Sequence, residues 1–385
     1  MLRRGILVVA LGAVLSTGGL SVVWAQPAVT PDELLSGRIF GATDDPSTSI
    51  ESSAVLALSD EMREFLRKNV NPGGTDIFKL QQLVDAIMGT KTFRLEYDEN
   101  TRTAAETFRL RRGNCLSFTT LFVSLARGAG LKADFQEVDI PPDWSTRKDV
   151  FVLNRHVNVY VDLGASGTRA VDFDIGDFKS TYEVDTISDN RAIAHFFNNV
   201  GVERMQAGDI VDAFAFFRRA ILETNGDFSP AWTNLGLLYR KGGHDEYAES
   251  AYLRALKADR ADVVAKSNLV RLYEMRGDTE EAQRYRKKVD QHRMRNPHLR
   301  FSLAREAFEN RDYDTAIEHL KYAIRKQKDE DEYYFLLGMC YLMTGDEEKA
   351  RRWTAKAERM AATDEKKRRY SSEFEALMAA SQKER

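Results

Sequence analysis

The second half of the chain repeats itself with a period of 34 or 35 residues, and this repeat constrains the fold more than any other feature of the sequence. One position of the repeat is small or aliphatic and recurs at Gly201, Gly236, Val270, Ala304 and Gly338, which are 35, 34, 34 and 34 residues apart. Twelve residues after each of these comes an alanine, at Ala213, Ala248, Ala282, Ala316 and Ala350. Such a period is typical of helical hairpins that bury their apolar faces only by stacking on their neighbours.

The second unit carries the fullest form of the pattern. It reads Trp232-x-x-Leu235-Gly236-x-x-Tyr239, followed by Ala248, Tyr252 and Ala255. This pattern resembles the tetratricopeptide repeat, in which small residues let the two helices of a unit approach closely. The resemblance covers residues 194–364 as five repeats and implies an all-α solenoid whose groove takes a protein or peptide partner. Residues 365–385 are then expected to form a polar helix that caps the solenoid.

Some repeat positions depart from this pattern. Arg204, Arg286 and Arg311 stand where it has aromatic or small residues, which weakens local contacts without changing the register. The first repeat is instead crowded with aromatic residues, at Phe196, Phe197, Phe214, Phe216 and Phe217. These side chains suit docking to the preceding domain and would leave the later repeats free for a partner. The alternative is that the repeats only brace that domain.

The N-terminus has the features of an export signal. Arg3 and Arg4 precede an uncharged apolar run from Gly5 to Val23, and Val23-Trp24-Ala25 places a small residue before a cleavage point. This pattern predicts a signal peptide over residues 1–25 and export of the mature chain, with a bacterial periplasm as the expected compartment. The alternative is an uncleaved membrane anchor. No other stretch approaches membrane-spanning length, so no integral span is expected after cleavage.

A chain of 385 residues is long enough for a second domain before the repeats. Residues 26–58 are rich in small and turn-forming residues and are expected to be an extended lead-in. Within residues 59–190, the apolar spacing is first helical and later alternates as in strands. Helices are expected at 60–69, 76–88, 103–111 and 114–129, and strands at 133–140, 157–163 and 169–173. This order predicts an α+β domain over residues 59–190.

Composition narrows the chemistry that this domain can perform. The only two cysteines, Cys115 and Cys340, exclude a disulfide framework, and no Cys/His spacing suits a structural zinc site. No metal or cofactor is therefore expected. A net charge of −3 gives no global basic surface, so nucleic-acid binding is not expected. Cys340 lies inside the fifth repeat and is expected to be a core residue.

Three residues of the α+β domain form a candidate catalytic set. Cys115 opens the expected helix at 114–129, where the positive end of the helix dipole favours a thiolate. His156 begins an expected strand and can serve as the general base. Asp172 lies on the next strand, flanked by Val171 and Phe173, and can fix the orientation of the imidazole. The alternative for Cys115 is a buried structural thiol.

The order of these residues resembles the transglutaminase-like core, a rearranged relative of the papain-type cysteine enzymes. The resemblance covers residues 75–175 and is carried by Arg112-x-Asn114-Cys115, by His156-Val-Asn158-Val and by Val171-Asp172, with sixteen residues from the histidine to the aspartate. It implies that Cys115 is the nucleophile, His156 the base and Asp172 the orienting residue.

Two departures from the family pattern leave alternatives open. Asn158 stands where the family often has tryptophan, and Asp172 is followed by Phe173-Asp174 where the family often has proline. Asp174 therefore remains a second candidate for the orienting residue. Gln136 is a candidate for the second donor to the oxyanion, beside the backbone N–H of Cys115.

The sequence therefore predicts a transglutaminase-like cysteine-protease fold of the α+β class, followed by a tetratricopeptide-repeat solenoid. The expected chemistry is attack on a peptide or amide carbonyl. The acyl group then passes to water, as in a peptidase or amidase, or to an amine, as in a cross-linking transglutaminase. The alternative is a non-catalytic adaptor that uses both domains to bind partners.

Overall fold

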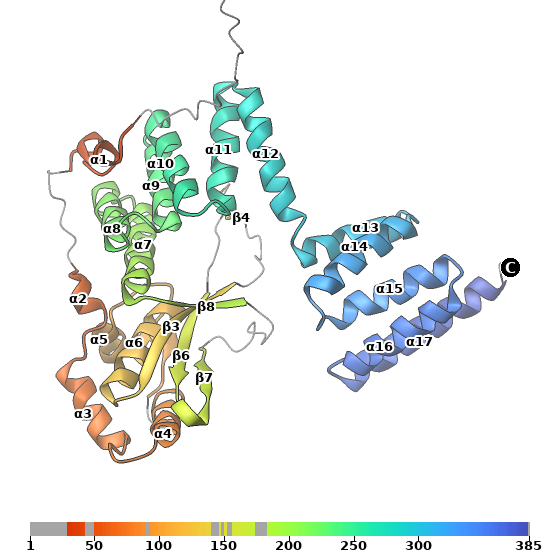
Figure 1. The fold of residues 1–385 in the computed structure, drawn as a ribbon, viewed down its shortest axis with the longest axis horizontal. Helices are drawn as coiled ribbons and strands as arrows, with labels where there is room; N and C mark the ends of the chain where they lie inside the picture. The colour runs from red at the N-terminus through yellow and green to blue at the C-terminus, as the bar shows by residue number, and fades with distance from the viewer. Residues whose placement is uncertain are drawn as a thin grey trace, which may run out of the picture.

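The computed structural model describes residues 29–42, 50–89, 93–139, 146–147, 150–151, 156–173 and 183–383. An α+β domain comes first and a long run of paired helices follows, as the sequence predicts (Figure 1). The predicted signal peptide lies outside the described residues. None of the helices in the described part of the chain combines the length and apolar character that crossing a bilayer requires.

The centre of the α+β domain is a four-stranded antiparallel sheet with the order β7-β6-β3-β8. Its strands are β3 (Lys132–Asp139), β6 (His156–Asp162), β7 (Thr168–Val171) and β8 (Glu183–Ile187). Short strand pairs lie outside it, namely β1 (Glu96–Tyr97) with β2 (Arg112–Gly113), and β4 (Thr146–Arg147) with β5 (Val150–Phe151). Strands β6 and β7 are joined through the 3₁₀ turn η2 (Gly164–Ser166), and Gly164 and Gly167 supply the positive φ angles of this connection.

Helices cover this sheet, and the most deeply buried of them carries the candidate nucleophile. The helices are α3 (Asp60–Asn69), α4 (Asp76–Met88), α5 (Ala104–Leu110) and α6 (Cys115–Gly128). Every residue of α6 from Leu116 to Ala126 is buried, since α6 packs on β3 and β6 on one side and on α3 and α4 on the other. The predicted helices at 60–69 and 76–88 are confirmed residue for residue.

The repeats form successive antiparallel helix pairs. They are α7 (Asp189–Ala207), α8 (Ile210–Glu223), α9 (Ser229–Lys241), α10 (Asp245–Ala258), α11 (Val263–Arg276), α12 (Thr279–Arg293), α13 (Pro297–Glu309), α14 (Tyr313–Lys326), α15 (Asp331–Met343), α16 (Glu347–Met360) and the final helix α17 (Asp364–Lys383). The small position of the repeat lies under a bulky side chain of the second helix. A Cβ on Gly236 would lie only 2.6 Å from the ring of Tyr252, which explains why this position must be small.

Two separate cores hold these helices together. The first runs without a break from the α+β domain through α7 to α12, and the five phenylalanines of the first repeat are all buried in it or against it. This is the docking that their crowding predicted. Helices α13 to α17 have cores of their own. In Figure 1 the chain turns between α12 and α13 into this second group of helices.

The lead-in segment is folded against the repeats where the structure describes it. It forms the short helices α1 (Pro31–Leu34), η1 (Arg38–Phe40) and α2 (Ser52–Val55), where the sequence suggested extended chain. The hydroxyl of Tyr239 on α9 donates to the carbonyl of Leu34 at 2.6 Å, and the ring of Phe40 stacks on that of Tyr239 at 4.9 Å. Residues before the α+β domain therefore help to pack the first repeats.

Candidate active site

The local structure at Cys115 follows from the residues around it. Asn114 caps α6, and its side-chain oxygen accepts from the N–H of Ser117 at 2.9 Å. Gly113 is required just before, because a Cβ there would lie 2.5 Å from the Cβ of Ser117. Cys115 is thereby placed at the first position of a buried helix while remaining partly exposed itself. This placement suits a nucleophilic thiol, since the free N–H groups of a helix start favour negative charge.

His156 is the first residue of β6, and Asp172 lies one residue past the end of β7 rather than within the predicted strand at 169–173. Their side chains meet because β6 and β7 are neighbours in the sheet. The Nε2 atom of His156 lies 2.7 Å from the Oδ2 atom of Asp172, and their side chains are only 12% and 9% exposed. An ionised carboxylate can only accept, so Nε2 carries the proton of this contact. In the neutral imidazole, the other ring nitrogen, Nδ1, is then the basic one. The structure thus brings together the side chains of His156 and Asp172, two of the three residues of the candidate set.

Asn158 is a third member of this polar cluster. Val159 pairs with Val171, so Asn158 lies almost opposite Asp172 on the adjacent strand. Its Nδ2 atom donates to Asp172 Oδ2 at 3.2 Å, and its side chain is fully buried. One carboxylate oxygen therefore accepts from both His156 and Asn158. Sequence reasoning noted Asn158 only because the family often has tryptophan there, and it missed the contact.

Contacts between α6 and the sheet bring the start of α6, which carries Cys115, close to the start of β6, which carries His156. The hydroxyl of Thr119 lies 2.9 Å from the carbonyl oxygens of both Cys115 and Val157, so the first turn of α6 lies directly beside the residue that follows His156. On the other side, the ring of Phe173 packs on that of Phe118 at 5.4 Å. The residue after Asp172 is therefore held against the same end of α6.

Two further residues were predicted near this site, Gln136 and Asp174. Gln136 is buried on β3 opposite Asn158, whereas Val138 is the residue opposite His156. Gln136 therefore stays a candidate for the second oxyanion donor. Asp174, the alternative orienting residue, lies outside the described residues. Across the part of the chain that the structure describes, no group of three or more His, Cys, Asp or Glu side chains could hold a metal ion.

The second cysteine is in a different environment. Cys340 is fully buried in the core of α13–α17, as the sequence predicts. Burial raises the pKa of its thiol to about 12. Since the thiolate is the reactive form, Cys340 is chemically quiet near neutral pH.

Comparisons with known families agree with both parts of this architecture. A family model described as the transglutaminase-like superfamily matches residues 63–163. Two models described as the tetratricopeptide repeat match residues 229–262 and residues 301–365. The transglutaminase-like match contains Cys115 and His156, and it ends before Asp172. A search of curated proteins found no match.

Solved structures similar to this chain are repeat proteins. MamA is 18% identical over 46% of this chain and 94% of its own, with a TM-score of 0.24. YrrB, described as a repeat protein with an unusual peptide-binding site, is 15% identical over 46% of this chain and 92% of its own, with a TM-score of 0.25. BtubC from P. vanneervenii is 19% identical over 45% of this chain and 81% of its own, with a TM-score of 0.26. With the family models and the observed helix pairs, the chain is identified as a transglutaminase-like core followed by tetratricopeptide repeats.

Proposed function

We propose that this chain is a cysteine hydrolase or acyltransferase that attacks peptide or amide bonds. Cys115 is the nucleophile, His156 the general base and then acid, and Asp172 the orienting residue. The observation that carries the proposal is the buried contact of 2.7 Å between His156 and Asp172 beside the first turn of α6. A base held in one tautomer next to a thiol at a helix start is what nucleophilic catalysis by cysteine requires.

The reaction follows from these roles. His156 Nδ1 takes the proton of the Cys115 thiol, and the sulfur attacks the carbonyl carbon of the substrate. The oxyanion that forms is stabilised by the N–H of Cys115 at the start of α6. The C–N bond then breaks, and the amine leaves with the proton from His156. The remaining thioester passes its acyl group to water, which gives a carboxylic acid, or to another amine, which gives a new amide.

Two further parts of the proposal concern place and partner. The predicted signal peptide over residues 1–25 supports export to a periplasm, where the mature chain would act. The repeats support a role in recruiting a protein or peptide, because solenoids of this kind present extended binding surfaces.

Water is the favoured acyl acceptor, since the sequence offers no recognisable site for a second amine substrate.

The rate of Cys115 alkylation against pH tests the catalytic proposal. The measurement uses the mature chain with Cys340→Ala, with and without His156→Ala. We expect fast alkylation near pH ~6 in the first protein. The second should follow the profile of an ordinary thiol, with a midpoint near ~8.5. Both variants should unfold at similar temperatures, which separates loss of the base from loss of the fold.

An inert thiol, or the same ordinary profile in both proteins, would remove the physical basis of the enzyme proposal. The non-catalytic adaptor would then be the better description. If the thiol is activated, turnover of peptide amides with and without an added primary amine distinguishes hydrolysis from cross-linking. Release of acid alone identifies a hydrolase, and incorporation of the amine identifies an acyltransferase.

A further inference from the structure

The repeat region is interrupted between α12 and α13, although the repeat pattern continues through this point. Sixteen residues after the small position, three of the other repeats bury a large side chain, at Phe217, Tyr252 and Leu320, and the fifth buries the smaller Thr354. The third repeat has Arg286 at this position, and its side chain is 56% exposed. Four residues later, where the first two repeats have Ile221 and Leu256, it has Asp290. In the first two repeats the large side chain packs over the small position of the same unit, so the third repeat lacks that contact. Among the described residues, helix α12 also shares no buried core with α13.

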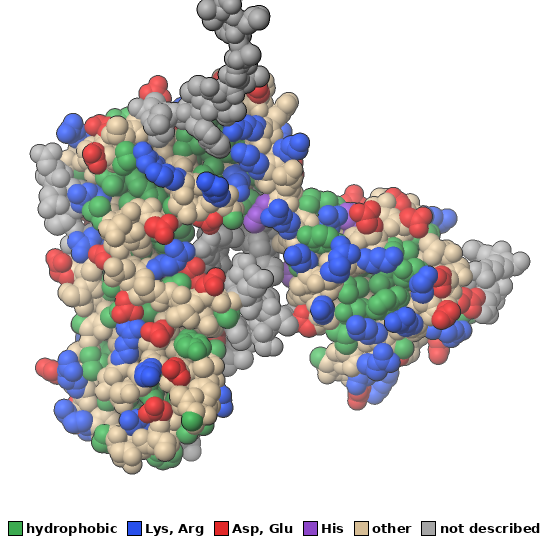
Figure 2. Space-filling model, in the orientation of Figure 1, with side chains coloured by type: hydrophobic (Ala, Val, Ile, Leu, Met, Phe, Trp, Pro, Cys, Tyr) green, Lys and Arg blue, Asp and Glu red, His purple; other side chains and the backbone are tan. Residues whose placement is uncertain are grey.

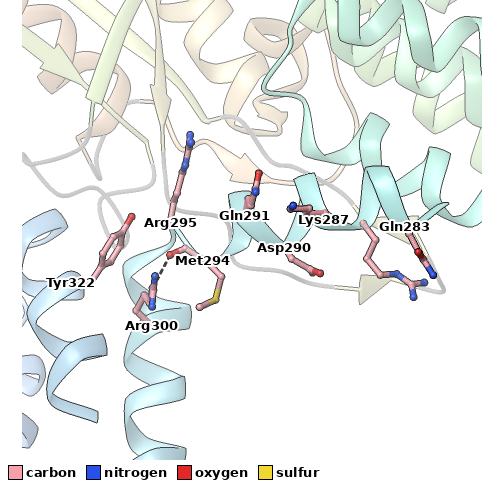
Figure 3. A pocket seen from close by; sticks show the side chains of 9 residues that line it. Gln283, Lys287, Asp290, Gln291, Met294, Arg295, Arg300 and Tyr322 are labelled. Carbon is pink, nitrogen blue, oxygen red and sulfur yellow. Dashed lines mark hydrogen bonds between the residues drawn. The ribbon is translucent and has the colours of Figure 1, made fainter. Parts of the chain in front are cut away.

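A cavity of about 800 Å³ lies at this interruption. Figure 3 shows that its walls come from one side of α12, the start of α13 and Tyr322 of α14. The lining residues are Gln283, Arg286, Lys287, Asp290, Gln291, Met294, Arg295, Arg300 and Tyr322. Among them are four bases and one acid, so the cavity is strongly positive. Most of the lining residues come from α12, the second helix of the third repeat, and the first helices of the repeats contribute only Arg300 of α13.

The four bases of the cavity are not equivalent. Arg286 forms an ion pair with Glu274 on α11. Arg300 is held in place, because it donates to the carbonyl of Met294 at 2.8 Å and stacks over Tyr322 at 4.5 Å. Lys287 and Arg295 are exposed, and no carboxylate within the described ranges is close enough to form an ion pair with either. These two side chains are therefore the ones available to a ligand.

Two titratable groups near the cavity, Lys266 and His319, have lowered pKa values. Burial lowers the pKa of Lys266 on α11; the charges of Asp262 and Asp259 oppose this, and the weaker effects of Lys288 and Arg295 add to it. Burial and the charge of Arg300 likewise lower the pKa of His319 on α14. On the α14 side, Arg300 is thus close enough to His319 to disfavour further positive charge there. Lys and Arg side chains are also frequent on the face of α13–α17 that Figure 2 shows.

We propose that this cavity binds an extended acidic peptide segment of a partner protein. Carboxylates of the segment pair with Lys287 and Arg295, and the side-chain amides of Gln283 and Gln291 pair with its backbone. A peptide fits better than a nucleic acid, because Asp290 in the middle of the cavity repels a continuous row of phosphates. This inference deepens the proposed partner role of the repeats and names the chemistry of the partner. It does not depend on the reactivity of Cys115.

Binding of a short fluorescent oligoglutamate peptide, followed by anisotropy, tests this site. The full mature chain with Cys115→Ala is used, so that the outcome is independent of the catalytic proposal. We expect saturable binding that weakens as salt is added, because exposed charges are screened. Reversal of both free bases, by Lys287→Glu and Arg295→Glu, should weaken binding at least tenfold. Both residues are exposed, so these changes should leave the fold intact.

A matched control reverses two exposed bases elsewhere on the repeats. Lys257→Glu and Arg260→Glu, at the end of α10, make the same change in net charge outside the cavity and should leave the affinity within about twofold of the starting protein. The proposal is wrong if the starting protein does not bind oligoglutamate, or if the cavity and control variants bind alike. It is equally wrong if a single-stranded DNA of similar charge binds more tightly and displaces the peptide.

Discussion

The two groups of repeats follow one sequence pattern but are held in different ways. Helices α7 to α12 share a continuous core with the α+β domain. Helices α13 to α17 keep the same register and bury their own apolar residues separately. The first group is therefore a structural extension of the candidate enzyme. The second is joined to it mainly through the chain between α12 and α13.

The difference shows what the repeat pattern does and does not determine. The small positions set how closely the two helices of one unit approach, and they are maintained through all five units. Arg286 stands where the first two repeats have the large side chain that packs over the small position, and Asp290 stands where they have an aliphatic residue. These polar side chains lie on the last helix before the break between the core of α7–α12 and the cores of α13–α17. A solenoid can therefore keep its register and still divide into two parts.

The largest expected effect comes from a matched pair of substitutions at one repeat position. Phe217→Ala removes a fully buried ring from the shared core and should cost about 3–5 kcal/mol of unfolding free energy. Arg286→Ala, at the equivalent position of the third repeat, removes an exposed side chain and should change it by less than about 0.5 kcal/mol. Urea denaturation followed by tryptophan fluorescence measures both. Similar losses in the two proteins would contradict the division described here.

Sequence reasoning anticipated part of this comparison. The repeat register and the docking of the first repeat followed from regular spacing and local crowding, which are visible without coordinates. Arg286 was recognised as weakening local contacts, but the extent of the interruption was not predicted. That extent depends on where Arg286 and Asp290 point once the neighbouring unit is placed. The folding of residues 29–42 onto α8–α10 was missed for a similar reason, because their partners lie about 200 residues away.

A second prediction tests how the first group of repeats is anchored to the sheet. Glu137 on β3 lies 2.7 Å from His195 Nε2 and accepts from Arg191 Nε at 2.6 Å, and both partners belong to α7. Burial alone would raise the pKa of Glu137, but hydrogen bonds from His195 and Arg191 outweigh it and hold the pKa well below its usual range. Glu137→Gln should therefore cost about 2 kcal/mol of unfolding free energy at neutral pH.

The effect of Glu137→Gln on stability should depend on pH, and its direction follows from the lowered pKa of Glu137. A carboxyl whose pKa is lowered on folding contributes stability above its unfolded value of ~4.3, and this contribution is lost as the pH falls below that value. The stabilities of the original protein and of Glu137→Gln should therefore differ at pH ~7 and converge as the solution is acidified. Thermal unfolding at a series of pH values measures this. A constant difference down to pH ~3 would show that the ionised carboxylate is not what anchors α7.

For the candidate site, the sequence singled out three residues but not the asparagine that contacts one of them. Cys115, His156 and Asp172 followed from residue type, order and spacing, because a helix start and two neighbouring strands leave clear signals. Asn158 did not, since an asparagine inside an apolar strand can be read only as a departure from the family. Its role appears when the register places it beside Asp172. Contacts between strands far apart in sequence are not visible in any single segment.

The smallest expected effect concerns this asparagine. Asn158→Ala should remove a donor to Asp172 Oδ2 and loosen the carboxylate that contacts His156. We expect roughly tenfold slower alkylation of Cys115 near pH ~6, with a smaller effect at alkaline pH, where the thiol ionises without help. The alkylation profile of the Cys340→Ala protein, with and without the change at Asn158, measures this.

A second substitution separates hydrogen bonding from packing. Asn158→Leu fills a similar volume without a donor, so it should slow alkylation as Asn158→Ala does. An unchanged profile in Asn158→Leu would show that volume alone matters at this position. Arg286→Ala serves as the control, because Arg286 lies in the third repeat, outside the α+β domain. This change should leave the alkylation profile of Cys115 unchanged. A shift there would mean that the interruption between α12 and α13 communicates with the candidate active site through the shared core of α7–α12.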